Sequence, residues 1–482
     1  MDRKWRTLVI VCVAIFMPLL DITVVNVALP KIQRDLHASF TDLQWVVDAY
    51  SLMLATVVLN AGSIADLVGR KRVFLVGVVM FTAASAACGA ATSPLFLNLA
   101  RGAQGIGGAV MFAVSLALLS QEFHGRERGT AFGIWGATVG AAVAIGPMVG
   151  GALTEWAGWR WIFFVNLPIG AACVLTGARV LHESRDEEHG GIDWAGLVGL
   201  SGGLFALVLG LLRGNDWGWS SGRIVGLFAG SAALIVAFVV VELRQEHPMF
   251  DVRLFGVPAF TGAQIVAFAI SSAMFSQFLY LTLYLQNVLG YSPVQAGLRF
   301  LPLSMISFFA APLSGRLSER VPIRALLAGG MGLVALALYL MYGVHESSGW
   351  TTLLAGFLIG GVGIGMVNPP LASTAVSVVP PRQAGMAAGV NNTFRQVGIA
   401  TGIAGLGAIF QSALNPRDAQ AITAGAVHTA QARAEFVHGL NDILLVAMFV
   451  ALAGAVLALA LVRRSDFVAS APQHEGAASA AA

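Results

Sequence analysis

The sequence has little charge. Only 11% of its 482 residues are Asp, Glu, Lys or Arg, and 57% are hydrophobic, whereas a soluble domain carries roughly 25% charged residues. Apolar runs recur from one end of the chain to the other. This excludes a soluble protein with a single anchor and predicts a polytopic helical membrane protein. The net charge of +3 is too small to indicate a nucleic-acid partner.

The sequence also lacks the motifs of ATP-driven and metal-dependent chemistry. No lysine lies in a G-x-x-x-x-G-K-[ST] phosphate-binding loop. None of the nine histidines lies well inside an apolar run, there is no H-E-x-x-H, and Cys12, Cys88 and Cys173 show no paired spacing. We therefore expect no cofactor, no metal site and no enzyme activity, and we expect transport to be driven by an ion gradient.

Fourteen apolar runs are long enough to cross a hydrocarbon core of about 30 Å as helices. The first is too long for a cleaved signal peptide and has no small-residue cleavage site after it. The predicted spans are 7–29, 43–65, 73–92, 95–119, 130–154, 161–181, 194–212, 223–243, 259–286, 294–315, 323–343, 351–378, 387–412 and 439–462.

Lysine and arginine are unevenly distributed over the segments between these spans. If the N-terminus lies in the cytoplasm, 18 of them fall in inside segments and 7 in outside segments. That bias follows the positive-inside rule and predicts that both termini are cytoplasmic. The abundance of Ala, and of Arg over Lys, suits a GC-rich bacterium, so we expect a bacterial plasma membrane.

Glycine-rich stretches recur in the same order along the chain, which indicates an internal repeat. The stretch from Gly62 to Asp66 is echoed from Gly315, and that from Gly129 to Gly133 is echoed from Gly385. Parallel six-helix halves with a site at their interface are one way to build a secondary transporter. We predict an all-α membrane protein that works as a monomer. Its parts are an N-terminal six-helix half (1–185), two inserted spans (186–250), a C-terminal six-helix half (251–464) and a disordered tail (465–482).

Charged residues inside predicted spans are candidates for function, because burying a charge in lipid costs at least a few kcal/mol. Asp21, Asp48 and Arg101 all fall at depths of roughly 8–10 Å below the outer surface. An acid beside an arginine stays ionised, and an acid moved into apolar surroundings takes up a proton. We therefore predict that the three residues handle a proton. A static buried ion pair that only fixes helix packing is the alternative.

Polar residues in the second half are candidates for a substrate cavity. Arg395 follows Asn391 and Asn392 in span 13, too deep to reach the surface easily, and is predicted to pair with substrate or with backbone carbonyls. Arg299, near the outer start of span 10, is expected to extend outward. Gln277, Tyr280 and Tyr284 share one face of span 9. They either line the cavity or form a structural hydrogen-bonding stripe.

A third set of residues is predicted to serve conformational change. Small residues in span 5 let a neighbouring helix come within van der Waals contact, and its proline lets the helix bend. Asp66, at the membrane edge, is positioned to accept hydrogen bonds from the N-terminus of a neighbouring helix, as an inner latch. The set comprises Gly62, Asp66, Gly69, Arg70, Lys71 and Arg72 around the loop after span 2, and Gly140, Gly146, Pro147, Gly150 and Gly151 in span 5.

These motifs, taken in order, resemble those of the major facilitator superfamily, and more closely its fourteen-span drug:proton antiporter branch. The resemblance rests on LLDITVVNVALPKI, GSIADLVGRKR, LNLARGAQGIGG, GAAVAIGPMVGG, WRWIFFVNLPIG and YLQNVLGYSP. It covers nearly all of 5–465. It implies the major facilitator fold and proton-coupled export of hydrophobic, often cationic, compounds by alternating access. In that family Asp21, Asp48 and Arg101 would handle the proton.

The chain departs from the family pattern at two points. Leu67 stands where the family usually has a basic residue, which would weaken the inner latch. Span 13 has no carboxylate, which leaves neutral, monocationic and anionic substrates open. A proton/drug antiporter in the bilayer is the predicted function. The alternatives are a proton-coupled metabolite symporter and a non-transporting membrane sensor of the same fold.

Overall fold

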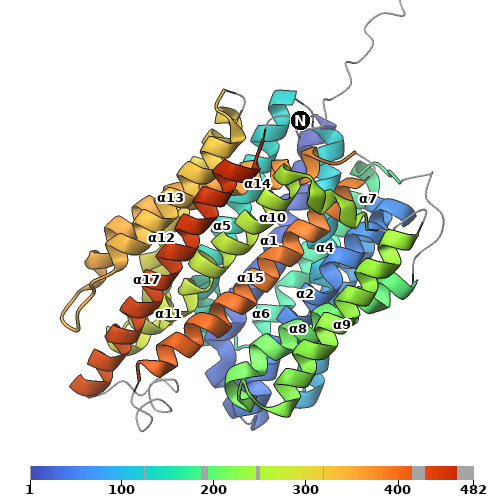
Figure 1. Ribbon diagram of the computed structural model, residues 1–482. Helices are drawn as coiled ribbons and strands as arrows, with labels where there is room; N and C mark the ends of the chain where they lie inside the picture. Colours follow the sequence, from blue (N-terminus) through green and yellow to red (C-terminus); the bar gives the residue numbers. More distant parts are fainter. Residues whose placement is uncertain are drawn as a thin grey trace, which may run out of the picture.

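The computed structural model describes residues 2–38, 40–123, 125–185, 194–245, 250–318, 320–380, 383–414 and 429–463, and these fold as a single bundle of long helices (Figure 1). The predicted tail at 465–482 lies outside this part. The elements, in chain order, are α1 (Arg3–Leu36), α2 (Phe40–Val68), α3 (Arg70–Gly89), α4 (Pro94–Glu122), α5 (Gly125–Trp156), α6 (Trp161–Phe164), α7 (Asn166–Val180), α8 (Trp194–Trp217), α9 (Gly222–Arg244), η1 (Val252–Gly256), α10 (Pro258–Ile270), η2 (Ser271–Phe275), α11 (Gln277–Leu283), η3 (Tyr284–Val288), α12 (Pro293–Leu317), α13 (Ile323–Met341), η4 (Trp350–Leu353), α14 (Leu354–Ser377), α15 (Ala384–Ser412) and α17 (Ala430–Leu461).

Within the described residues, twelve helical segments are long and apolar enough to cross a membrane. The helices α5 and α15 are not among the twelve, although they have 32 and 29 residues. Both are rich in glycine, and α15 also carries Asn391, Asn392 and Arg395, which lower its hydropathy. The count of fourteen spans therefore stays a prediction.

Local sequence signals set several helix starts. Ser292 forms a capping box with Gln295, and Pro293 occupies the first turn of α12. Ser93 accepts a hydrogen bond from the backbone N–H of Phe96 at the start of α4. In each case a serine oxygen satisfies an N–H that the helix itself leaves unpaired, and the proline has no N–H to leave unpaired.

The predicted ninth span is not one regular helix. It runs as α10, η2, α11 and η3, and both η2 and η3 are π-helical turns. A π turn inserts one extra residue and rotates the side chains that follow it, so residues of α10 and residues of α11 do not keep one helical spacing. Gln277 and Tyr280 lie together in α11, after the first π turn. The inserted spans are also longer than predicted, because α8 continues through Arg213 to Trp217.

Glycines bring the N-terminal and C-terminal helices together along two seams. A Cβ on Gly62 of α2 would lie 2.2 Å from the carbonyl oxygen of Gly385 in α15. A Cβ on Gly315 of α12 would lie 2.0 Å from the carbonyl oxygen of Gly129 in α5. Since Gly62 and Gly315 are repeat counterparts, as are Gly385 and Gly129, the two seams are equivalent contacts related by the repeat.

The inserted helix α8 lies against one of these seams. Val208 of α8 packs with Leu52 and Ala55 of α2 and with Ala400 of α15 in one buried apolar cluster. Its partner α9 packs on α8 and is largely exposed, as a lipid-facing helix would be. The inserted pair therefore contacts both halves through α8, which packs on α2 and α15.

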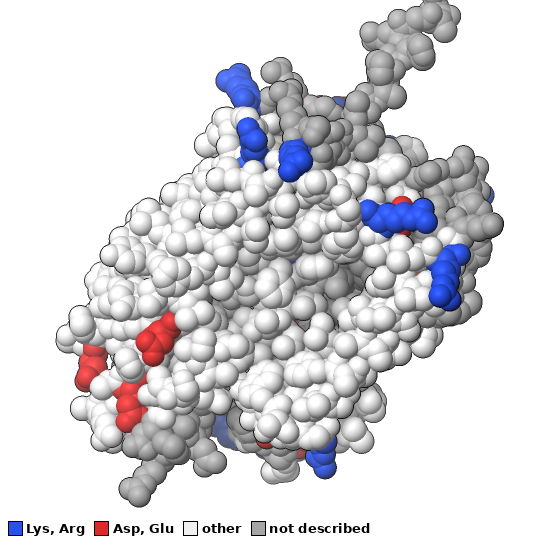
Figure 2. Space-filling view, viewed as in Figure 1, with Lys and Arg blue, Asp and Glu red and all other residues white. Residues whose placement is uncertain are grey.

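Charge is confined to the two ends of the bundle on the face drawn in Figure 2. Lysine and arginine gather mainly at the end where the N-terminus lies, acidic residues lie mainly at the other end, and a broad uncharged band separates them. A band of this kind is what a hydrocarbon core requires of the surface it contacts.

Candidate functional site

Asp21 of α1 and Arg101 of α4 form a buried ion pair in the N-terminal half. The Arg101 guanidinium donates from Nη1 to Asp21 Oδ2, and each side chain is 1% exposed. Gln104, one turn further along α4, donates from Nε2 to Asp21 Oδ1 at 2.9 Å and accepts from Arg101 Nη1 at 2.7 Å. The acid, the base and the amide thus form a closed triangle.

The rest of the Arg101 side chain is also held. Its Nε donates to the carbonyl oxygen of Val46 at 2.9 Å, and its guanidinium carbon lies 4.3 Å from the centre of the Tyr50 ring. Tyr50 in turn donates its hydroxyl to the carbonyl oxygen of Pro18 at 3.1 Å. Helices α1, α2 and α4 are therefore joined at this point, so a change of charge at Asp21 acts on all three.

Asp48, the third residue predicted for this cluster, makes its ion pair elsewhere. Its Oδ2 lies 2.9 Å from Nη2 of Arg213 in the inserted helix α8, and its side chain is 19% exposed. Arg213 also contacts Asp216 Oδ2 at 3.1 Å and lies 4.6 Å from the Trp45 ring centre. Arg213 lies one residue beyond the predicted span 194–212, but α8 continues through it to Trp217.

Asp66 accepts hydrogen bonds from the first turn of α15, as predicted. Its carboxylate receives the backbone N–H of Gly385 at 3.2 Å and that of Met386 at 2.9 Å, and it also receives Arg70 Nε at 2.8 Å. These are the N–H groups that a helix N-terminus leaves unpaired, where a negative charge is favoured. The bond joins the N-terminal half to the C-terminal half at the end bearing the N-terminus.

The basic loop after α2 is fixed by a different acid. Gly69 has φ +124°, in the left-handed region, and a Cβ there would meet the Glu183 carboxylate. Glu183 accepts the backbone N–H groups of Lys71 at 3.1 Å and Arg72 at 3.2 Å, the first turn of α3. The Lys71 ammonium donates to the carbonyl oxygen of Ala178 at 2.7 Å. The loop is therefore tied to the end of α7 within its own half.

The glycines of span 5, predicted to let a neighbouring helix come within van der Waals contact, face two different helices. A Cβ on Gly140 would lie 3.5 Å from Ser307 Oγ, and one on Gly151 would lie 2.8 Å from Val294 Cγ2, so both face α12. Gly146 and Gly150 instead lie against Thr23 and Val24 of α1. Pro147 falls within α5, and its side chain lies outside the described part. The centre of the motif therefore packs within the N-terminal half, and its flanks pack against the C-terminal half.

Arg395 of α15 is buried in the C-terminal half, and among the described residues no carboxylate lies within ion-pair distance of it. Its Nη1 donates to Asn368 Oδ1 at 3.1 Å, and its guanidinium carbon lies 5.6 Å from the centre of the Phe275 ring. Its two neighbours on α15 also make hydrogen bonds. Asn391 donates to Gln264 Oε1 at 3.2 Å, and Asn392 donates to the carbonyl oxygen of Phe112 at 3.4 Å.

Gln277, Tyr280 and Tyr284 are buried, and each donates to a backbone carbonyl. Gln277 Nε2 reaches Ile443 at 3.0 Å, and the Tyr280 and Tyr284 hydroxyls reach Ile403 and Ser348, each at 3.1 Å. Their hydrogen-bonding groups serve contacts within the C-terminal half, which agrees with the structural stripe rather than with a cavity lining.

The outer arginine of span 10 packs on aromatic rings. The Arg299 guanidinium lies 3.4 Å from the Tyr291 ring centre and 5.6 Å from that of Trp350, and Nη1 donates to the carbonyl oxygen of Gln295 at 2.8 Å. This placement agrees with the expectation that Arg299 extends outward.

Two residues of the site were not identified from the sequence. Gln104 is three residues after Arg101, and therefore on the same face of a helix, which is the signal that was available. Asn368 directly precedes two prolines inside α14, and its side chain is the partner of Arg395. Nothing in the sequence joins these two residues, which are 27 positions apart.

A family model described as Major Facilitator Superfamily matches residues 11–403. The chain is 37% identical over 415 residues to the tetracenomycin C resistance and export protein of Streptomyces glaucescens, covering 85% of this chain and 76% of that protein. It is 38% identical over 410 residues to the puromycin resistance protein of Streptomyces alboniger, covering 83% and 81%.

The crystal structure of a human organic anion transporter superposes with a TM-score of 0.64 at 16% sequence identity, covering 94% of this chain and 100% of that one. At this identity the likeness shows the fold alone. Together with the family match it confirms the fold that the sequence motifs implied.

Proposed function

The chain belongs to the major facilitator superfamily of transporters, and on this premise we propose that it is a proton-coupled antiporter that exports hydrophobic, drug-like compounds. The functions for which its relatives are named, resistance to and export of antibiotics, support the direction of transport and the substrate class. The observation that carries the coupling is the buried triangle of Asp21, Arg101 and Gln104.

The proposed proton acceptor is Asp21. A proton on this carboxylate cancels the charge that holds Arg101 and removes one acceptor of Gln104. Because a buried charge left without its partner is costly, Arg101 then has to find other partners. The three helices joined through this residue would shift in response, which is how one proton becomes a conformational change.

Alternating access is proposed to use the two glycine seams as contacts that close and separate. The bond from Asp66 to the first turn of α15 stabilises the state in which the end bearing the N-terminus is closed. Breaking it exposes two backbone N–H groups and one carboxylate, a modest cost if water replaces the lost bonds. A latch whose hydrogen bonds contribute only a modest free energy leaves both conformational states accessible, as a transport cycle requires.

We further propose that the protein is a monomer in a bacterial plasma membrane, with both termini in the cytoplasm. The bacterial relatives and the concentration of Lys and Arg at the end bearing the N-terminus support this orientation (Figure 2). The repeat supplies both sides of the central interface within one chain, so a second copy is not required.

The test is efflux from proteoliposomes under an imposed pH gradient. We expect Asp21→Asn to abolish gradient-driven efflux, because asparagine cannot exchange the proton, while binding of the compound persists. Arg299→Gln, which removes a charge on the outer aromatic surface, serves as control and should keep the wild-type rate. Gradient-driven efflux by Asp21→Asn at the wild-type rate would rule out Asp21 as the coupling acid.

A metabolite symporter is the second candidate, and the direction of transport separates it from the proposal. In vesicles of known orientation, a symporter accumulates its substrate in the direction of proton flow, whereas an antiporter moves it the opposite way. A sensor of the same fold would bind the compound and move no protons.

A further inference from the structure

Two of the buried arginines, Arg101 and Arg395, differ in their partners, and the difference bears on the charge of the substrate. Arg101 has a carboxylate, whereas among the described residues Arg395 is bonded to the neutral amide of Asn368 and lies over the ring of Phe275. A guanidinium in the middle of a membrane protein is costly unless an anion neutralises it. Arg395 is 9% exposed, so water compensates little of that cost.

Among the described residues, no acid is paired with Arg395. The segments α10, η2 and α14, which pack on α15 in the C-terminal half, contain no Asp or Glu. Asp48 and Asp66 of α2, which also packs on α15, are paired with Arg213 and Arg70. The two carboxylate oxygens of Asp21 are bonded to Arg101 and Gln104. A cationic compound placed beside Arg395 would therefore meet a like charge and no acid to offset it.

Further hydrogen-bond donors lie at the same level of the seam between the halves. A Cβ on Gly136 of α5 would be 3.4 Å from Asn368, the partner of Arg395, and Trp135 directly precedes Gly136 in α5. Trp135 is 2% exposed, and its indole N–H has no hydrogen-bond partner among the described residues. The Ser307 hydroxyl, next to Gly140, is likewise buried without a partner there. Indole and guanidinium groups donate and do not accept.

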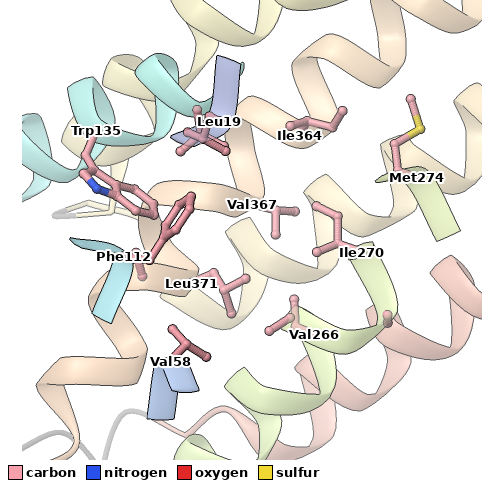
Figure 3. Close-up of a cluster of buried hydrophobic side chains, with 14 of the residues drawn as sticks. Leu19, Val58, Phe112, Trp135, Val266, Ile270, Met274, Ile364, Val367 and Leu371 are labelled. Atoms are coloured by element: carbon pink, nitrogen blue, oxygen red, sulfur yellow. The ribbon is translucent and has the colours of Figure 1, made fainter. Parts of the chain in front are cut away.

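The walls around these donors are apolar and aromatic. Figure 3 shows the Trp135 ring beside Phe112, with Leu19 of α1 and Ile364 and Val367 of α14 near them. The carbonyl oxygen of Phe112 is the acceptor of Asn392, three residues before Arg395 on α15. Apolar walls with a few convergent polar groups are the usual composition of a small-molecule site.

We propose that this seam binds the exported compound as an organic anion. The compound would be an apolar molecule bearing one ionised acidic group such as a carboxylate. Arg395 is its counter-ion, the Trp135 indole N–H is a second donor, and the aromatic rings hold the scaffold. The inference rests on the proposed export function and narrows its substrate to anions.

The experiment compares two probes of the same shape on the purified full chain in nanodiscs, anthraquinone-2-carboxylate and anthraquinone-2-carboxamide, by calorimetry at neutral pH. We expect the wild-type protein to bind the carboxylate at least about tenfold more tightly, as a charge-assisted hydrogen bond in a buried site implies. Arg395→Gln should remove this preference by weakening the carboxylate alone, with the carboxamide affinity changed less than about twofold.

Two further variants locate the effect. Arg395→Lys keeps the charge and should keep part of the preference, although lysine lacks the planar fork of arginine. Arg299→Gln removes a charge outside the seam and should leave the preference intact. If Arg395→Gln fails to fold, the preference for the carboxylate can still be measured in the wild-type protein and in Arg395→Lys. Both proteins retain a cation in the seam, so both should prefer the carboxylate.

Equal wild-type affinity for the two probes, or a preference for the carboxamide, would overturn the inference. So would Arg395→Gln weakening both probes alike, since that result assigns Arg395 to packing. The outcome is separate from that of the export proposal, because binding needs no gradient. Carboxylate binding without gradient-driven efflux would contradict the export proposal and leave the anion site standing.

Discussion

The N-terminal and C-terminal halves keep the same contacts where their helices cross and differ in the charges they bury. Gly62 against Gly385 and Gly315 against Gly129 are repeat-related contacts with nearly the same spacing. Arg101 of the first half is paired with an acid, whereas Arg395 of the second is paired with none among the described residues. The comparison suggests that the two halves share their helix packing but differ in their chemistry. The proposed proton site lies in the first half, and the proposed anion site lies in the second.

The strongest test of this difference is to replace Arg101 and Arg395 in turn and to measure thermal unfolding of both variants in the same detergent. Arg101→Ala leaves Asp21 buried without its cation and should lower stability by about 3–5 kcal/mol. Arg395→Ala strands no acid and should cost clearly less. In the double variant Asp21→Asn/Arg101→Gln, no charge remains, so part of the loss should be recovered. Equal losses from the two alanine variants would show that Arg395 has an anionic partner after all.

The equivalence of the two seams can be tested with single methyl groups. Gly62→Ala and Gly315→Ala each place a Cβ about 2 Å from a backbone carbonyl oxygen of the other half, so the helices must separate, at a cost of about 1–3 kcal/mol. Gly226→Ala in α9 and Gly332→Ala in α13 have nothing within 4 Å of the new Cβ, and should be neutral or slightly stabilising. A large loss of stability at one seam alone would mean that the two repeat-related contacts contribute unequally to the stability of the protein.

The latch at Asp66 gives a smaller effect. Asp66→Asn loses the charge that faces the N-terminus of α15, worth about 0.5–2 kcal/mol. Hydrogen exchange of the Gly385 and Met386 amides should become faster, because they lose their best acceptor. Glu183→Gln is the matched control, since it weakens the cap of α3 within one half and should leave the α15 amides protected. Unchanged exchange in Asp66→Asn would remove the latch from the mechanism.

The sequence predicted the fold and the hydrogen bonds of Asp66 because both follow from local patterns. Apolar length gives the spans, and an acid before a basic loop at the membrane edge is positioned for a helix N-terminus. The pairing of Asp21 with Arg101 followed from comparing depths along two helices. Depth along a helix is set by the rise per residue, so it can be read from a sequence.

What the sequence did not predict depends on rotation about helix axes and on partners distant in the chain. Asp48 has a depth similar to that of Asp21, but its side chain is directed to Arg213 of an inserted helix. The π turn of η2 precedes Gln277 and Tyr280 and changes the direction in which both face, relative to α10. A one-residue bulge rotates everything after it by about 100°, and no pattern in that apolar segment signals it.

The smallest expected effect concerns the two acids of the N-terminal half. Asp48→Asn removes one partner of Arg213, which keeps Asp216 at 3.1 Å and the Trp45 ring. Because Asp48 is 19% exposed, against 1% for Asp21, water can replace what is lost, and the stability cost should stay below about 1 kcal/mol. Proton-driven efflux by Asp48→Asn should fall by less than about tenfold and keep its dependence on the gradient, whereas Asp21→Asn should lose it. The measurement is the initial efflux rate at several imposed gradients. If Asp48→Asn uncouples transport as fully as Asp21→Asn does, both acids carry the proton, and the inserted helix α8 belongs to the coupling site rather than to the scaffold around it.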